Sequence, residues 1–233
     1  MQETLAEKTY QRLRRRVLRG EFRPGEQLVN RVLAEEMGIS MAPLREAIHR
    51  LATEGIVRHV PGAGAFVPKL TRRDLEELYI LRESVESCAA AEAARYISES
   101  QLEELDAICR DSVAIAEQIG REEGQVASAE LFDRWLDLEE QFHATLVDAA
   151  HNRTLKKVIV EHRALVRIFE ALHRRPAILT RAVAEETCQG HAALVAALRQ
   201  RDAELVRQLM SNHIRRGRQT MAEFFRRHPP DQE

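Results

Sequence analysis

The sequence predicts a mainly α-helical protein, with an N-terminal winged helix-turn-helix that carries a small β-hairpin wing, followed by an all-α antiparallel helical bundle. Three observations predict this. Apolar residues recur at helical spacing through most of the 233 residues. The turn "GIS" at 38–40 separates two short helical segments. Two β-prone runs, "IVRHV" and "AFVP", then flank "PGAG" at 61–64, which is typical of a hairpin.

The first 69 residues are expected to form three helices and the wing. Asn30 is expected to cap the second helix, which Gly38 ends, and Ser40 is expected to cap the third. Pro43 is tolerated in the first turn of that third helix. The three helices are predicted at residues 4–19, 31–37 and 41–54.

The remaining residues are helical in pattern to the end. Thr71 and Asp74 resemble a capping box, and Asp202 is a good cap for the last helix. Six helices are predicted, near residues 71–96, 99–118, 127–150, 153–173, 177–200 and 202–227. The predicted domains are therefore a winged helix at residues 1–69 and a helical bundle at residues 70–233.

Charge is unevenly distributed along the chain. Residues 1–70 hold 12 Lys and Arg against 8 Asp and Glu, whereas the remainder is net acidic. This distribution favours an N-terminal part that binds a polyanion, although random scatter explains the same numbers. No apolar run is long enough to span a membrane, no signal peptide is visible, and the three cysteines show no paired spacing. We expect a cytoplasmic protein with free thiols.

Residues with the chemistry to contact DNA cluster in the predicted helix-turn-helix. The second helix of such a motif places its N-terminal residues in the major groove, and here that helix begins at Met41 with Arg45 one turn later. An arginine fork pairs with guanine O6 and N7. Arg31 can meet a phosphate at the start of the preceding helix, and Gly62 and Gly64 allow the wing backbone to approach a groove.

The alternative is that these arginines are internal ion-pair partners. Arg45 would then pair with Glu46 or Glu54, and Arg31 with Glu35.

The segments "VLRGEFRPGEQL" and "LVNRVLAEEMGISMAPLREAIHRLATEGIVRHVPGAGAFV" resemble the winged-helix domain of the GntR superfamily of bacterial transcription regulators. The resemblance covers about residues 10–68 and implies DNA contacts from Arg31, Arg45 and the wing. The predicted DNA-binding set is Arg31, Ser40, Met41, Arg45, Gly62 and Gly64. The sequence departs from the family at Met41, where Arg or Lys is usual after the serine. One cationic contact is therefore lost, or replaced by apolar packing on a thymine methyl or sugar.

The second half contains a candidate set of metal ligands. Glu139 and His143 are four residues apart and share a helix face. His191 and His213 each lie about 11 residues from the break at 201–202, so they can lie level in an antiparallel hairpin. Three imidazoles and one carboxylate suit zinc or a similar divalent ion. An isolated histidine is more often solvated or in a core, and Cys188 is an alternative ligand or a buried thiol.

This half resembles the FCD-type ligand-binding domain of the FadR branch of the same superfamily, over about residues 71–227. The segments that carry the resemblance are "ELYILRESVESCAAAEAA", "EEQFHATLVDAAHN" and "GHAALVAALRQRDAELVRQLMSNHI". It implies a homodimer and a metal held by Glu139, His143, His191 and His213, with Glu139 where Asp is usual. Arg82 matches an arginine common in the first helix of that domain and would bind an effector carboxylate. Its alternative partners are Glu83, Glu86 or the second subunit.

These residues predict a DNA-binding transcription regulator, a repressor, that binds a pseudo-palindromic operator as a homodimer. A small organic-acid metabolite bound beside a divalent metal would control it. Zinc is the expected ion, with nickel and manganese as alternatives. A metal-ion-responsive regulator is a second hypothesis. A metal-dependent hydrolase is a third, which is disfavoured because no nucleophile–base pair, phosphate loop or H-E-x-x-H is present.

Overall fold

The computed structural model describes residues 4–69, 71–172 and 176–227. The chain forms two compact units, one from Met1–Leu78 with Val160–Arg174 and one from Tyr79–Ile159 with Arg175–Glu233. Residue 70, where the second domain was predicted to start, lies outside the described residues, and so does residue 173, where one helix was predicted to end. The outer ends of the two predicted domains, at residues 1–3 and 228–233, also lie outside them.

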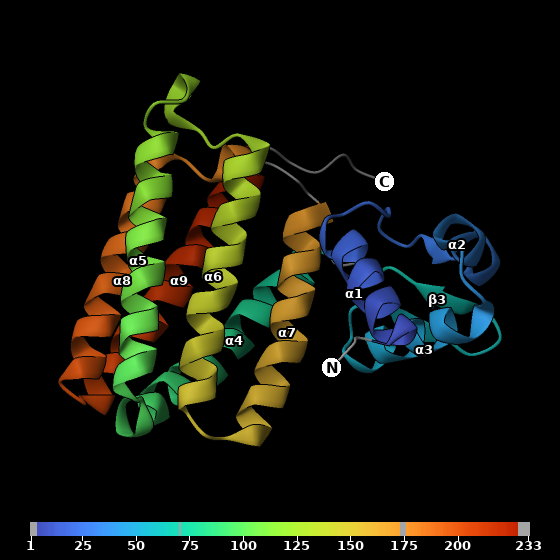
Figure 1. The fold of residues 1–233 in the computed structure, drawn as a ribbon. Helices are drawn as coiled ribbons and strands as arrows, with labels where there is room; N and C mark the ends of the chain where they lie inside the picture. The colour runs from blue at the N-terminus through green and yellow to red at the C-terminus, as the bar shows by residue number, and fades with distance from the viewer. Residues whose placement is uncertain (1–3, 70, 173–175, 228–233) are drawn as a thin grey trace. The chain divides into compact units, whose positions relative to one another are not determined.

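The first unit contains the winged helix-turn-helix that the sequence predicts. Its helices and strands, labelled in part in Figure 1, are α1 (Leu5–Leu18), β1 (Gln27–Leu28), α2 (Asn30–Met37), α3 (Met41–Thr53), β2 (Arg58–Val60) and β3 (Gly64–Phe66). Strands β2 and β3 form the expected hairpin. Strand β1 also pairs with β3, so the sheet has the antiparallel order β1-β3-β2. The third strand was not predicted because a two-residue strand leaves no alternation to detect.

The ends of the two helices of the motif follow the sequence in part. Gly38 adopts a left-handed φ of 64° directly after α2. Ser40 occupies the N-cap position of α3 as predicted, but its side chain makes no capping hydrogen bond. The prediction that Asn30 caps α2 is wrong: Asn30 is the first helical residue, and the cap position belongs to Val29. Val29 has no side-chain acceptor, so no side chain caps this helix start.

The core of the first unit fixes which face of α3 points outward. Leu44, Ile48 and Leu51 repeat at helical spacing and are buried, two of them completely. They pack with Leu13 and Val17 of α1. Burying one such side chain stabilises the fold by about 1.5–3 kcal/mol, so this face is held firmly against α1. The opposite face of α3, which contains Arg45, is therefore left at the surface.

The rest of the chain is helical, as predicted. The helices are α4 (Arg72–Tyr96), α5 (Glu99–Ile119), α6 (Ala129–Ala149), α7 (Arg153–Leu172), α8 (Arg181–Arg199) and α9 (Ala203–Arg227). Helix α8 begins four residues later than expected, because Pro176–Ile178 form a separate 3-10 turn and Thr180 caps the helix. Thr71 and Asp74 form the expected reciprocal cap, and Asp202 accepts from the Leu205 amide.

Helices α5, α6, α8 and α9 lie side by side in Figure 1 and form a bundle. Helix α5 packs on α6 and α8, and α8 packs on α9. Short connections join α5 to α6 and α8 to α9, so each of these two pairs is antiparallel. A core around Trp135, Phe132, Leu131 and Ile115 holds the α5–α6 side together. The α8–α9 pairing brings the level histidine positions of the two helices within reach of each other.

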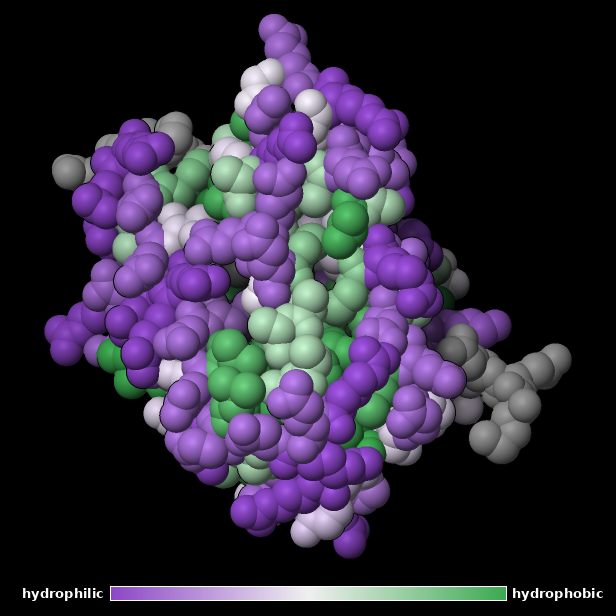
Figure 2. Space-filling model, turned by 90° about the vertical axis from the view of Figure 1, so that its left-hand side faces the viewer, coloured by the Kyte–Doolittle hydropathy of each residue, from purple (hydrophilic) through white to green (hydrophobic). Residues whose placement is uncertain are grey.

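The surface is largely hydrophilic. Figure 2 shows the left-hand side of Figure 1, where α8 lies. On this face, hydrophobic side chains gather in a central strip that is bordered by hydrophilic ones. Such a strip is a surface that another molecule can cover. In the part of the chain that the structure describes, no helix combines the length and the apolar character needed to cross a membrane.

Candidate functional site

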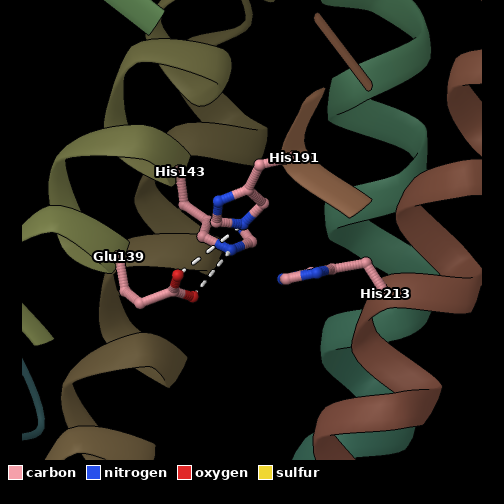
Figure 3. A group of neighbouring side chains, drawn as sticks. All are labelled: Glu139, His143, His191 and His213. Atoms are coloured by element: carbon pink, nitrogen blue, oxygen red, sulfur yellow. Dashed lines mark ion pairs between the residues drawn. The ribbon is translucent and has the colours of Figure 1, made fainter. Parts of the chain in front are cut away.

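Four predicted ligands converge inside the helical unit. Helix α6 supplies Glu139 and His143 from one face, α8 supplies His191, and α9 supplies His213. Figure 3 shows the four side chains pointing toward one another. One ligand atom from each residue lies within 4.8 Å of the others. The i, i+4 spacing on α6 and the level positions on the α8–α9 hairpin thus produce one cluster.

Two residues of the cluster, His143 and His191, are buried, and Glu139 and His213 are half-buried. His143 is 1% exposed and His191 is completely buried. Phe142, itself fully buried, stacks on His191 with ring centroids 3.7 Å apart and planes 10° from parallel. The Glu139 carboxylate lies between the two imidazoles, with Oε2 3.9 Å from Nε2 of His143 and Oε1 3.7 Å from Nε2 of His191. The donor atoms are therefore held in place by packing within the unit.

The electrostatics of the cluster favour a neutral imidazole at His213. The pKa of His213 is lowered to about 3, mainly by loss of hydration on burial and next by the positive charge that His191 would carry. Arg82 lowers the pKa further, whereas Glu139 and Glu86 oppose the shift. Part of the His213 side chain reaches the surface, but its imidazole is surrounded by protein. A neutral imidazole is the form that binds a metal.

The residues present fit a divalent metal ion. Three histidine nitrogens and one carboxylate oxygen are a donor set that zinc accepts, and the four atoms lie within 4.8 Å of one another. The same set also suits nickel or manganese. Glu139 stands where the resembling family usually has aspartate, and its side chain, which is one methylene longer, lies within the cluster.

A second carboxylate, Glu86 of α4, lies behind His143. Its Oε2 is 3.0 Å from Nδ1 of His143, and its Oε1 is 2.8 Å from Nε of Arg82. Both Glu86 and Arg82 are buried, at 2% and 9% exposure. The Arg82 guanidinium carbon also lies 4.9 Å from the ring centre of Tyr79. Arg82 is thus brought beside the four clustered residues, where its charge acts on His213.

Of the alternatives for Arg82, pairing with Glu86 is observed and pairing with Glu83 is not. Glu83 instead accepts hydrogen bonds from Ser211 and Arg215 of α9. The sequence contained one sign of the Arg82–Glu86 pair, their i, i+4 spacing. The contact between Glu86 and His143 was missed because nothing in the spacing shows that α4 lies against α6.

Cys188 is not part of the ligand cluster. It is buried, one turn from His191, and burial raises the pKa of its thiol to about 12. A protonated thiol is a poor metal ligand. Of the two roles predicted for Cys188, the buried thiol is therefore the one that fits the structure.

The predicted DNA-reading residues lie on the surface of the first unit. Met41 is the first residue of α3 and is 37% exposed, and Arg45 is exposed one turn later. Arg45 forms no ion pair with any residue that the structure describes, because Glu54 instead bonds Tyr10 and lies 4.0 Å from Arg14. Within the described ranges, Arg31 is also exposed and forms no pair with Glu35. The alternative prediction, that each arginine forms an ion pair within the protein, is not observed among the described residues.

The wing has the backbone that its glycines predicted. Gly62 and Gly64 adopt φ values of 77° and 105°, a backbone conformation that residues with a side chain rarely adopt. Gln27 of β1 donates from Nε2 to the carbonyl of Ala63 at 2.6 Å and so supports the wing turn. A Cβ at position 64 would lie 3.2 Å from that nitrogen. Gln27 was not predicted, because its role depends on the unexpected strand β1.

The structure adds three residues to the exposed surface of this unit. His49 follows Arg45 by one turn on the outward face of α3, and Arg58 and His59 are exposed on β2. The signal that could have revealed His49 is its i, i+4 spacing from Arg45 in the predicted helix. The surface that holds Met41 and Arg45 therefore extends along α3 and includes a further titratable group.

Known protein families match both parts of the chain. The family described as "Bacterial regulatory proteins, gntR family" matches residues 5–67, and the family described as "FCD domain" matches residues 77–216.

Individual relatives agree with these matches. The chain is 31% identical to the HTH-type transcriptional regulator YdhC of Bacillus subtilis over 160 residues, which are 66% of this chain and 63% of that one. It is 27% identical to the HTH-type transcriptional repressor GlaR of Escherichia coli, over 88% of this chain and 90% of that one. The solved structure of E. coli McbR/YncC has the same fold, with a TM-score of 0.75, 22% identity, and coverage of 97% and 100% of the two chains.

Proposed function

The chain belongs to the gntR family of bacterial regulatory proteins and carries an FCD domain, and from this premise we propose that it is a transcriptional repressor controlled by a small carboxylate. The name of one relative, the repressor GlaR, supports the sign of regulation. The family and the relatives are regulators and not enzymes, so nothing supports the hydrolase alternative. The alignment spans 63% of the length of YdhC, so no activity is taken from that relative.

The observation that carries the proposal is the cluster of Glu139, His143, His191 and His213 beside Arg82. A divalent ion bound there would offer a coordination position to an anionic oxygen. Arg82 adds a guanidinium, which binds a carboxylate through parallel hydrogen bonds. An anion entering an acidic half of the chain needs such cations, and only an anion uses both the ion and the arginine.

DNA binding would come from the first unit. The exposed Arg45 at the start of α3 is suited to base edges, and Arg31 and the wing glycines are suited to the phosphate backbone. The Ser40 hydroxyl does not cap α3, so it can serve as a further phosphate donor. We expect a cytoplasmic homodimer on a pseudo-palindromic site, and the apolar strip of Figure 2 is a surface that a second copy could cover.

The test compares wild type with Arg82→Ala and Arg82→Lys in thermal melting and operator binding. The probes are acetate, oxalate, succinate and citrate, with glucose as the uncharged control. A carboxylate that binds should stabilise wild type by roughly 2.7 kcal/mol at a hundredfold excess over Kd, and should change operator affinity by about 1–3 kcal/mol. Both variants should lose this response and keep ligand-free DNA binding, since lysine cannot form the two parallel bonds.

Arg215→Ala is the matched control, because Arg215 is an exposed arginine of α9 that pairs with Glu83, the neighbour of Arg82 on α4. It should respond like wild type. If Arg82→Ala also responds like wild type, or if only uncharged ligands shift melting, the carboxylate proposal is wrong. A response of operator binding to the metal alone would instead favour the metal-ion-responsive regulator.

A further inference from the structure

Glu86 occupies a position that the proposed function does not yet use. It is 2% exposed on α4, and its two carboxylate oxygens meet two different donors. Oε2 lies 3.0 Å from Nδ1 of His143, and Oε1 accepts from Nε of Arg82 at 2.8 Å. One carboxylate therefore connects a predicted metal ligand with the predicted effector arginine.

The contact with Glu86 determines which nitrogen of His143 faces the cluster. Nδ1 points at Glu86, whereas Nε2, on the other side of the ring, lies 3.9 Å from Oε2 of Glu139. A neutral imidazole carries one proton, and a carboxylate acceptor draws that proton to Nδ1. The lone pair of Nε2 is then directed at the other three ligands.

The second oxygen of Glu86 acts on Arg82 in the same way. It holds the Nε edge of the guanidinium, and the Tyr79 ring lies 4.9 Å from the guanidinium carbon. The two terminal nitrogens of Arg82 lie at the other end of the group. Glu86 thus restricts the orientation of the arginine as well as that of the histidine.

We propose that Glu86 is a positioning residue that fixes His143 in its metal-binding tautomer and Arg82 in its effector-facing orientation. The inference rests on the proposed function, since it assigns a support to the same metal site. Partners of this kind orient metal-bound histidines and raise their basicity, and their loss lowers metal affinity by about 10–100-fold.

Glutamine at this position separates positioning from simple packing. Glutamate offers an acceptor to both His143 and Arg82, whereas glutamine has one acceptor oxygen and one donor nitrogen. Whichever way the amide turns, one of the two donors loses its acceptor. If the amide nitrogen faces His143, it favours a proton on Nε2, and a protonated Nε2 cannot bind a metal.

The experiment is a zinc titration against a competing chelator, with wild type, Glu86→Gln and Glu83→Gln. Glu83 is the matched control, because it lies one turn earlier on α4 and also accepts from two donors, Ser211 and Arg215, but is outside the cluster. Glu86→Gln should bind zinc about 10–100-fold more weakly than wild type. Glu83→Gln should bind zinc like wild type, and circular dichroism of the zinc-free proteins should show all three folded.

The outcomes distinguish this inference from the proposed function. Wild-type affinity in Glu86→Gln, or equal losses in both variants, overturns the role of Glu86 and leaves the metal site intact. A wild type that binds no zinc overturns the metal site and the inference together.

A second measurement uses only the wild-type protein, so it does not depend on whether a variant folds. In zinc-loaded wild-type protein labelled with nitrogen-15 at histidine, NMR should show the proton of His143 on Nδ1 and the metal on Nε2. Coordination through Nδ1, or a proton on Nε2, would overturn the inference.

Discussion

Arginine has opposite surroundings in the two units of this protein. Arg45 on α3 is exposed and has no ion pair within the described residues. Arg82 on α4 is 9% exposed, bonded to Glu86 and close to the Tyr79 ring. A cation left at the surface of a helix-turn-helix is available to a large polyanion. A cation buried with its partners is available only to a small ligand that enters the bundle, and the proposed function therefore places DNA on the first unit and the carboxylate in the second.

The same contrast appears within α3. Arg50 lies five residues after Arg45 on α3 and is half-buried, and its side chain makes contacts within the unit. It donates to Glu7 at 2.6 Å and its guanidinium carbon lies 3.9 Å above the Tyr10 ring. Glu54 accepts from the Tyr10 hydroxyl, and burial together with that contact raises the Tyr10 pKa to about 12. Position along the helix therefore separates an arginine with contacts inside the unit from the exposed arginine that is predicted to read DNA.

The largest effect is expected from removing a metal ligand. His143→Ala and His213→Ala should each lose the ion, since a buried site of four donors becomes one of three. The loss of affinity should exceed the roughly 10–100-fold that is typical of a supporting partner. Metal analysis of purified protein should give about one divalent ion per chain for wild type and none for the variants, and melting temperature should fall with it.

His59→Ala is the control for this experiment, because His59 is an exposed histidine on β2 outside the cluster. It should retain the ion. If purified wild type holds no metal and a chelator leaves its stability unchanged, the cluster does not bind a metal.

A smaller effect is expected from Arg45→Ala. The variant should lose about 1–3 kcal/mol of binding free energy on the cognate operator, with relaxed preference at one base position. The measurement is a titration against the operator and against each substitution at that position. Arg50→Ala should instead lower the melting temperature and leave base preference unchanged, since its contacts are within the unit. Equal losses for Arg45→Ala on cognate and random DNA would show that Arg45 contacts only phosphate.

Both the fold and the clustering of the four predicted ligands could be predicted from the sequence, because they depend on local spacing. Gly38 ends α2 and Asp202 caps α9, and the break near Asp202 places His191 and His213 level across a hairpin. Strand β1 was missed because two residues carry no period. Helix α8 begins late because Pro176 starts a separate turn, which looks helical in sequence.

The support of the site was not accessible in the same way. Glu86 meets His143 because α4 lies against α6, and the two residues are far apart in sequence. Gln27 supports the wing through a strand that only the folded sheet reveals. Residues that act through another residue depend on how elements pack, and a single sequence contains no record of that packing.

The smallest effect is expected from Met41→Arg, which tests whether the start of α3 faces the duplex. Met41 is exposed at the first position of that helix. The GntR superfamily, which the sequence resembles, usually has Arg or Lys at this position. An added arginine should tighten binding to all DNA and steepen the salt dependence by about one phosphate contact, since each neutralised phosphate releases counterions. Leu5→Arg adds the same charge at an exposed position on α1, outside the helix-turn-helix, and should change the slope less. Equal slopes for wild type and Met41→Arg would mean that Met41 does not face DNA, and the DNA-reading surface of α3 would then begin at Arg45.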